Sequence, residues 1–335
     1  MTGAVLPLGV TMGEPAGIGG EIVLKAWLRR RAGRLPFFVI DDPDRLRNIA
    51  SRLELQVPVC EIEAPESAGQ IFSESLPVLA EPLRVPSVPG KLDPANAPAV
   101  ISAIDRAVSL VRERRIDAIV TNPIHKKCLY DAGFRHPGHT EYLASLVSTE
   151  TRPVMMLACP GLRAVPVTIH MPLRQAITSL SSDTIVHCAT VTAQSLSADF
   201  GIAEPRIAVS GLNPHAGEAG SLGTEETEVI APAIEQLRAA GILVEGPLPA
   251  DSLFHEAARQ AYDAVICMYH DQALIPIKTI GFDRGINITL GLPFVRTSPD
   301  HGTALDIAGT GKAGEESLVA AIATATAMAR RRYHA

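Results

Sequence analysis

Short, continuous apolar runs alternate along the chain with segments in which apolar residues recur at helical spacing. In the segment 94–115, Val100, Ile104, Val108 and Val111 recur every three or four residues, which predicts a helix with one buried face. Further helices are expected over 20–30, from 42 onward, over 142–147 and over 318–331. The apolar runs are typical of strands buried on both faces of a sheet, and they cover residues 5–11, 37–40, 116–120, 154–158, 164–169, 206–210 and 264–269. This alternation predicts an α/β protein with a mainly parallel sheet.

The segment 64–91 interrupts the alternation. It is rich in proline and serine and contains only short strand candidates. We therefore expect this segment to form an excursion from the main sheet.

Composition and charge narrow the class of protein. The 335 residues suggest roughly two domains. Thirty Lys and Arg against 36 Asp and Glu give a formal net charge of −6, which argues against general nucleic-acid binding. No apolar run approaches the roughly 20 residues that span a bilayer. The five cysteines form no Cys-x-x-Cys pair, and the N-terminus has no basic leader, so we expect reduced thiols and a cytoplasmic location.

Three histidines occupy the same kind of position. His170, His215 and His270 each follow an apolar run, either directly or after a short turn. Ligands of open parallel sheets gather outside the carboxyl ends of the strands, so these imidazoles are candidates to hold one divalent ion, with Asp271 or Glu218 orienting a ring. The long spacings carry no motif, and a single histidine at a strand end is usually just a polar loop residue.

A second group of polar residues is suited to binding an anion. His139 and Thr140 precede a predicted helix, where Thr140 could instead act as an N-cap. Lys278, Asn287 and Arg296 are isolated in an apolar stretch of low charge. A single such cation usually extends to solvent, but two cations and an amide in one short stretch favour a specific pocket for an oxyanion.

Two glycine-rich segments do not fit the common nucleotide motifs. The turn Gly13-Glu-Pro-Ala-Gly-Ile-Gly-Gly20 lacks the Gly-Lys-Ser/Thr of a P-loop. The run Gly309-Thr-Gly-Lys-Ala-Gly314 matches Gly-x-Gly-x-x-Gly, but no strand directly precedes it and only one helix follows. Neither segment predicts a Rossmann-type dinucleotide site.

Six motifs together resemble the 4-hydroxythreonine-4-phosphate dehydrogenase family of pyridoxal phosphate biosynthesis. The resemblance extends from Thr11 to about Gly314. The motifs are Gly13-Glu-Pro-Ala-Gly-Ile-Gly, Gly138-His-Thr-Glu, Gly211-Leu-Asn-Pro-His-Ala-Gly-Glu, Gly246-Pro-Leu-Pro-Ala-Asp-Ser-Leu-Phe, Met268-Tyr-His-Asp-Gln and Gly285-Ile-Asn-Ile-Thr-Leu-Gly-Leu-Pro-Phe-Val-Arg-Thr-Ser-Pro-Asp-His-Gly-Thr-Ala.

The resemblance implies a fold similar to that of isocitrate and isopropylmalate dehydrogenases. Two α/β domains with an active-site cleft between them are then expected. Residues 1–130 plus 300–335 would form the outer domain, and residues 131–299 the inner domain with the metal ligands and the dimer interface. A homodimer with its active site at the subunit interface is implied as well.

The resemblance also assigns roles to individual residues. It implies a divalent metal (zinc, magnesium or cobalt) on His170, His215 and His270, and substrate binding by His139, Thr140, Lys278, Asn287 and Arg296. The run that starts at Asp300 is similar to the dinucleotide loop of isopropylmalate dehydrogenases, which implies contacts of NAD(P) with His301, Gly302 and Thr303. Asp251 is our candidate for the catalytic base or a substrate anchor, with Asp271 as the second choice.

The reaction implied is an NAD(P)-dependent oxidation of 4-phosphooxy-L-threonine at C3. Its product, 2-amino-3-oxo-4-phosphooxybutanoate, would lose CO2 to give 3-amino-2-oxopropyl phosphate. Alternative substrates within the family are 4-phospho-D-threonate, the corresponding erythronate and cyclic dihydrodiol carboxylates. Acyl transfer to phosphate and a catalytically inactive binding protein are alternatives of other classes.

Overall fold

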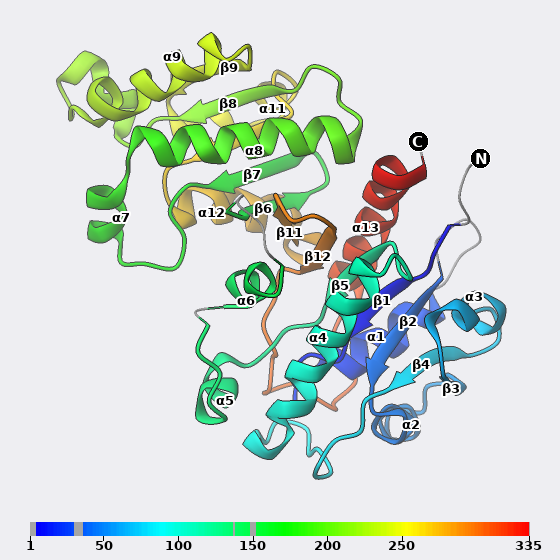
Figure 1. Ribbon diagram of the computed structural model, residues 1–335. Helices are drawn as coiled ribbons and strands as arrows, with labels where there is room; N and C mark the ends of the chain where they lie inside the picture. Colours follow the sequence, from blue (N-terminus) through cyan, green and yellow to red (C-terminus); the bar gives the residue numbers. More distant parts are fainter. Residues whose placement is uncertain (1–4, 30–35, 137, 148–151, 335) are drawn as a thin grey trace. The chain divides into compact units, whose positions relative to one another are not determined.

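The computed structural model describes residues 5–29, 36–136, 138–147 and 152–334 (Figure 1). The chain divides into two compact units. Unit 1 comprises Met1–Pro153 and Leu292–Ala335, and unit 2 comprises Val154–Gly291. The outer and inner domain ranges expected from the sequence, with their assigned roles, stay a prediction.

Unit 1 contains six parallel strands in the order β3-β4-β2-β1-β5-β12. Their bounds are β1 Leu8–Thr11, β2 Phe37–Asp41, β3 Val59–Ile62, β4 Leu76–Ala80, β5 Ala118–Thr121 and β12 Val295–Pro299. The expectation that 64–91 leaves the main sheet was wrong, because β4 lies inside it between β3 and β2. The apolar run of β4 is only five residues long and contains Pro77, so its pattern is weak, yet Leu76, Val78 and Leu79 are buried.

Helices cover both faces of the unit 1 sheet. The helix α4 packs on β1, β2 and β5, whereas α13 packs on β12 and β5 with α1 beside it (Figure 1). The four residues that predicted α4 are all buried, from 1 to 3% exposed, which confirms its apolar face. The helices are α1 Gly19–Leu28, α2 Pro43–Arg52, α3 Ala68–Ile71, α4 Ala97–Arg112, α5 Lys126–Asp131, α6 His139–Ser145 and α13 Glu316–His334, with short 3-10 turns η1 Pro65–Ser67 and η2 Pro94–Asn96.

Unit 2 also contains six strands, in the order β11-β6-β7-β10-β8-β9. The strands are β6 Val154–Cys159, β7 Leu162–Pro166, β8 Arg206–Ser210, β9 Leu243–Leu248, β10 Ala264–Cys267 and β11 Ile286–Leu290. The β6–β7 pair is antiparallel because a tight turn at Pro160 and Gly161 joins the two strands, and the β11–β6 pair is antiparallel as well. The other pairs are parallel, so the expected mainly parallel α/β architecture is confirmed.

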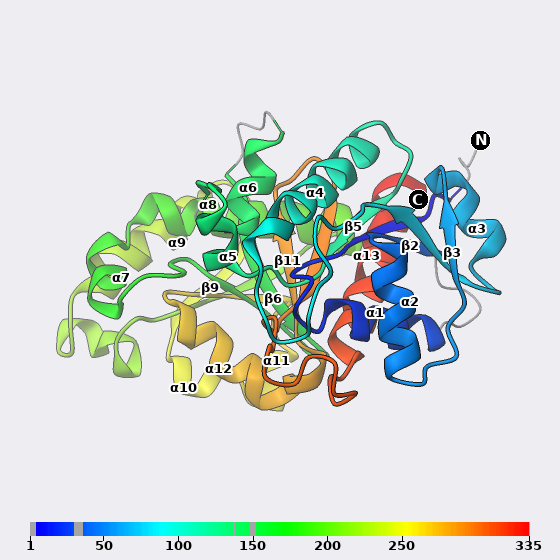
Figure 2. The same ribbon diagram turned by 90° about the horizontal axis from the view of Figure 1, so that it is seen from below.

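Two long helices enclose the unit 2 sheet. Figure 2 shows α8 on one side of it and α12 on the other. The helix α8 begins with a capping box between Ser181 and Thr184 and ends at Gly201, whose φ is 71°. Helical segments of this unit are α7 Leu173–Ser179, α8 Ser182–Phe200, α9 Ala231–Ala239, α10 Ala250–Leu253, α11 Glu256–Arg259, α12 His270–Gly281, η3 Pro214–Gly220, η4 Glu226–Ile230 and η5 Phe282–Arg284.

The described ranges contain no helix that combines the length and the apolar character needed to cross a membrane. All five cysteines are free, and Cys128, Cys188 and Cys267 are buried. The structure therefore holds no disulfide among them, as expected from their spacing.

Candidate metal centre and substrate site

The three histidines follow three neighbouring parallel strands of unit 2. The strand β10 lies between β7 and β8 and runs parallel to both. His170 follows β7, His215 follows β8 and His270 follows β10, each within five residues of the strand end. Because the three strands point the same way, their carboxyl ends meet at one edge of the sheet, where α/β proteins bind ligands.

His170 and His270 lie side by side at this edge. Their ring centroids are 5.6 Å apart, a separation at which two imidazoles can share one ion with metal–nitrogen distances of about 2.0–2.1 Å. They line a pocket of about 220 Å³ together with Ile169, Met171, Leu173, Ala176, Tyr269 and Asp271. The arrangement provides two nitrogen donors beside space for a further ligand.

Asp271 orients the His270 ring. One of its carboxylate oxygens, Oδ1, lies 2.7 Å from Nδ1 of His270. When Nδ1 carries the proton and donates it to the carboxylate, Nε2 keeps its lone pair for a metal, which is the usual arrangement around ligating histidines. Glu218, the other residue considered for this role, lies in the His215 turn and is exposed.

His215 lies in an unusual left-handed turn. The φ angles are 55° at His215, 52° at Ala216, 77° at Gly217, 42° at Glu218 and 55° at Ala219. Its side chain is exposed. Across the described residues, no three His, Cys, Asp or Glu side chains are grouped closely enough to hold a metal ion. A single chain thus brings two of the three histidines together and leaves His215 outside the group.

The buried carboxylate of Glu226 holds this turn in place. Its Oε1 accepts the backbone N–H of Leu212 at 2.8 Å and of Asn213 at 2.7 Å, while Oε2 accepts the Asn213 side-chain amide at 2.9 Å. Glu226 is only 3% exposed. The sequence did not reveal this role of Glu226, because the run Thr224-Glu-Glu-Thr-Glu228 is typical of a solvent-exposed acidic helix start.

Asp251 belongs to a neighbouring element. It is exposed in the first turn of α10, and α10 contacts η3, the segment that carries His215. The structure therefore places the helix that carries this carboxylate beside the His215 turn.

In unit 1, His139 and Arg296 are near each other and buried at their polar ends. Nε2 of His139 is buried and has no hydrogen-bond partner among the described residues. Arg296 is 3% exposed and donates from Nε and Nη2 to Oγ1 of Thr121, at 3.2 and 2.6 Å. Burial lowers the pKa of Arg296 to about 10, with nearby Glu141 opposing the change. Burial, and then the Arg296 charge, lowers the pKa of His139 well below 6.5, so a neutral imidazole faces a charged guanidinium.

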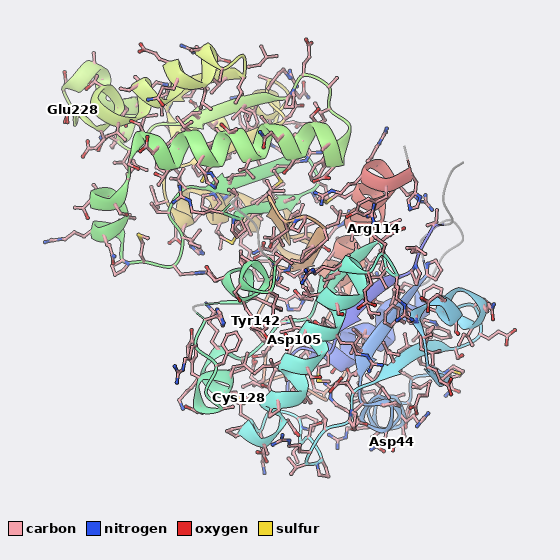
Figure 3. All side chains as sticks on the ribbon, in the orientation of Figure 1. Asp44, Asp105, Arg114, Cys128, Tyr142 and Glu228 are labelled. Atoms are coloured by element: carbon pink, nitrogen blue, oxygen red, sulfur yellow. The ribbon has the colours of Figure 1, made fainter. Side chains whose placement is uncertain are left out.

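The helix that carries His139 and Thr140 is anchored to the core of unit 1. The Tyr142 hydroxyl on α6 donates to Oδ1 of Asp105 on α4, and the two side chains point toward each other (Figure 3). Burial and the Asp105 carboxylate raise the pKa of Tyr142, which keeps it a donor. The N-cap of α6 is Gly138, so Thr140 lies inside the helix and its alternative role as N-cap is excluded.

Lys278 and Asn287 belong to unit 2. Lys278 lies on α12 eight residues after His270, which is about 12 Å along a helix axis. Its Nζ is 5.2 Å from the centroid of the Phe282 ring. Asn287 lies on β11, and its Oδ1 is buried without a hydrogen-bond partner in the described part of the chain.

The segment proposed for dinucleotide contacts packs against the first glycine-rich turn. The carbonyl of Thr303 accepts the backbone N–H of Ile18 at 3.0 Å. A Cβ added at Gly17 would lie 2.8 Å from the same carbonyl, so the close approach requires glycine there. A pocket of about 230 Å³ lies beside this turn, and its lining includes Gly17, Arg45, Arg52, Pro89 and Gly309. His301, Gly302 and Thr303 are not among its lining residues.

Comparisons with known proteins give one consistent result. The family model described as pyridoxal phosphate biosynthetic protein PdxA matches residues 34–325. A 4-hydroxythreonine-4-phosphate dehydrogenase of Bradyrhizobium diazoefficiens is 54% identical over 338 aligned residues, covering 97% of this chain and 98% of the relative. One from Methylorubrum populi is 53% identical over 97% of this chain and 95% of the relative. The crystal structure of the Klebsiella pneumoniae 4-hydroxythreonine-4-phosphate dehydrogenase is 39% identical, with a TM-score of 0.86 over 97% of this chain and 99% of that one.

Proposed function

The chain belongs to the family of the pyridoxal phosphate biosynthetic protein PdxA, and from this we propose that it is a 4-hydroxythreonine-4-phosphate dehydrogenase. It oxidises 4-phosphooxy-L-threonine at C3 and transfers the hydride to NAD(P)+. The product, 2-amino-3-oxo-4-phosphooxybutanoate, loses CO2 to give 3-amino-2-oxopropyl phosphate. The observation that carries this proposal is the identity of 54% over nearly the whole length of a relative of that name.

We assign a divalent cation to His170, His215 and His270. The neighbouring rings of His170 and His270 and the carboxylate behind His270 form a donor set of the kind that binds transition metals. Among zinc, cobalt and magnesium, imidazole donors favour the first two, since magnesium prefers oxygen ligands. When bound, the cation would act as a Lewis acid on the substrate hydroxyl group that is oxidised.

The chain's own residues bind the charged ends of the substrate. Arg296 keeps its charge at neutral pH because its pKa remains near 10, and its planar guanidinium suits a phosphate or carboxylate. Lys278 supplies a second cation, and His139, Thr140 and Asn287 supply neutral hydrogen-bonding groups. We propose that the exposed carboxylate of Asp251 accepts the proton of the substrate hydroxyl. His301, Gly302 and Thr303 contact the dinucleotide.

We further propose that the protein is a cytoplasmic homodimer with its active site at the subunit interface. The separation of His215 from the His170–His270 pair within one chain supports this arrangement, because a second copy can complete the ligand set. The strands that carry the three histidines have their carboxyl ends at the same edge of unit 2, where such a shared site would form.

Steady-state kinetics test the proposal. We expect NAD(P)H formation from 4-phosphooxy-L-threonine with a higher kcat/KM than from 4-phospho-D-threonate or from a cyclic dihydrodiol carboxylate. Chelation of divalent metal should abolish turnover, and Zn²⁺ or Co²⁺ should restore it. A higher kcat/KM for 4-phospho-D-threonate would show that this compound is the substrate. Product formation that depends on coenzyme A, without NAD(P) reduction, would show that the protein is an acyl transferase.

A further inference from the structure

A series of buried polar contacts joins the three loops that carry the histidines. It begins next to His170, where Thr168 donates from its hydroxyl to the carbonyl of Met268 at 2.8 Å and from its backbone N–H to the same oxygen at 3.3 Å. Thr168 is 5% exposed and Met268 is 1% exposed. The loop after β7 is therefore fixed to the end of β10, two residues before His270.

Gln272 extends this series of contacts to the loop that carries His215. Its Oε1 accepts the backbone N–H of Met268 at 2.7 Å, and its Nε2 donates to the carbonyl of Gly211 at 2.8 Å. Gln272 is 7% exposed, in the first turn of α12. Both polar atoms of its amide are thus hydrogen-bonded, Oε1 to the loop of His270 and Nε2 to the loop of His215.

Gly211 packs directly against the His215 turn. A Cβ added at Gly211 would lie 2.9 Å from Cα of Ala216, the residue after His215. The backbone N–H of Gly211 donates to the carbonyl of Leu248 at 2.8 Å, which fixes its other side. Because interiors are close-packed, a shift of the Gly211 carbonyl displaces the turn as a whole.

We propose that Gln272 is a positioning residue that sets the spacing between the His270 loop and the His215 turn of each chain, so that in the proposed dimer each of these histidines is held where its divalent cation requires it. The proposal rests on the metal centre of the proposed function. Gln272 touches neither the cation nor the substrate, and it acts through the backbone of Met268 and Gly211. A single buried side chain thus hydrogen-bonds to both loops.

The test is the affinity of the purified full-length protein for Co²⁺, measured by calorimetry and by the visible absorption of bound Co²⁺, which reports coordination geometry. Gln272→Met removes both hydrogen bonds, and we expect it to raise the Kd by about 10–100-fold. Gln272→Glu keeps an oxygen for Met268 but loses the amide donor to Gly211, so it should alter the absorption spectrum and weaken binding. Thr168→Val removes one contact of the same series and should have a smaller effect in the same direction.

Thr192→Val is the matched control, because it removes a buried hydroxyl of unit 2 that donates only within its own helix. It should leave the Co²⁺ affinity unchanged. Should the folded Gln272 and Thr168 variants bind Co²⁺ with wild-type affinity and spectrum, Gln272 is merely structural and the inference is overturned. A wild-type protein that binds Co²⁺ no better than His170→Ala would instead refute the proposed metal centre.

Discussion

Burial determines how His139 and Arg296 are protonated, and thereby what each can offer to an anion. Arg296 is enclosed and hydrogen-bonded to Thr121, yet it keeps its charge at neutral pH since its pKa is about 10. His139, next to it, is held neutral because protonation would bury a second positive charge. One cation and one neutral imidazole can therefore bind the same oxyanion without repelling each other.

His139 should make the protein sensitive to acid. Its pKa in the folded protein lies well below 6.5, so below that pH the unfolded chain binds a proton that the folded chain does not. The stability present above pH 6.5 is then lost as the pH falls, by about 1.4 kcal/mol per unit for this one group. Urea unfolding of wild type and His139→Gln at about pH 7.5 and about pH 5.5 checks this. A wild-type advantage that does not shrink at the lower pH would contradict the neutral state of His139.

Replacing Arg296 by lysine should weaken substrate binding more than it weakens the fold. The change keeps the charge but loses the planar pair of donors, at a cost of about 2 kcal/mol, or about thirtyfold in KM for the phosphorylated substrate. Initial-rate kinetics measure this effect. Arg163→Lys changes a partly buried arginine outside the proposed site, so it serves as the control and should leave KM unchanged. Equal KM values for all three proteins would remove Arg296 from the substrate site.

At the scale of elements, the His215 turn depends on a partner that lies outside its own sequence. Six successive residues with positive φ, from 215 to 220, would unwind readily on their own, since the left-handed conformation costs about 1–2 kcal/mol per non-glycine residue. Glu226, at the start of η4, offsets this cost by accepting hydrogen bonds from Leu212 and Asn213. The turn and η4 therefore form one structural element.

Gly217→Ala should disrupt this element specifically. The new Cβ would lie 2.6 Å from Oε2 of Glu226, in addition to the strain of a φ of 77°. Gly241→Ala has a φ of 80° but meets nothing within 4 Å, so it isolates the backbone strain. We expect both variants to lose stability in urea, and only Gly217→Ala to lose Co²⁺ affinity as well. Equal effects of the two variants on Co²⁺ binding would contradict the role of Glu226 in holding His215.

At the scale of the whole molecule, some features follow from local pattern and others do not. That His170, His215 and His270 each follow a strand could be predicted, because each apolar run is local. That these strands are neighbours is known only from the structure, because strand order depends on contacts between distant segments. The place of β4 within the main sheet was missed because Pro77 and its proline-rich flanks obscure a short run. The left-handed turn of His215 and the bridge made by Gln272 depend on contacts between segments far apart in sequence. Single-sequence patterns contain no signal for such contacts.

The proposed homodimer predicts complementation between inactive variants. His215→Ala and His270→Ala should each be inactive alone. If these two ligands come from different subunits, mixed and reassociated chains form heterodimers with one intact site, and about a quarter of wild-type activity returns. Activity assays after mixing, with sedimentation to confirm dimers, provide the measurement. A mixture of dimers that exchange subunits but stay inactive would show that one chain supplies both ligands.

The order of strands in unit 2 has a consequence for biosynthesis. The ribosome completes β7 and β8 first, and β10 emerges later although it occupies the position between them. A nascent chain that ends before Ala264 therefore cannot align its first two histidine-bearing segments, because the strand that separates them has yet to be made. If the proposed metal centre forms at this edge, its ion is expected to bind only after β10 has been inserted between β7 and β8.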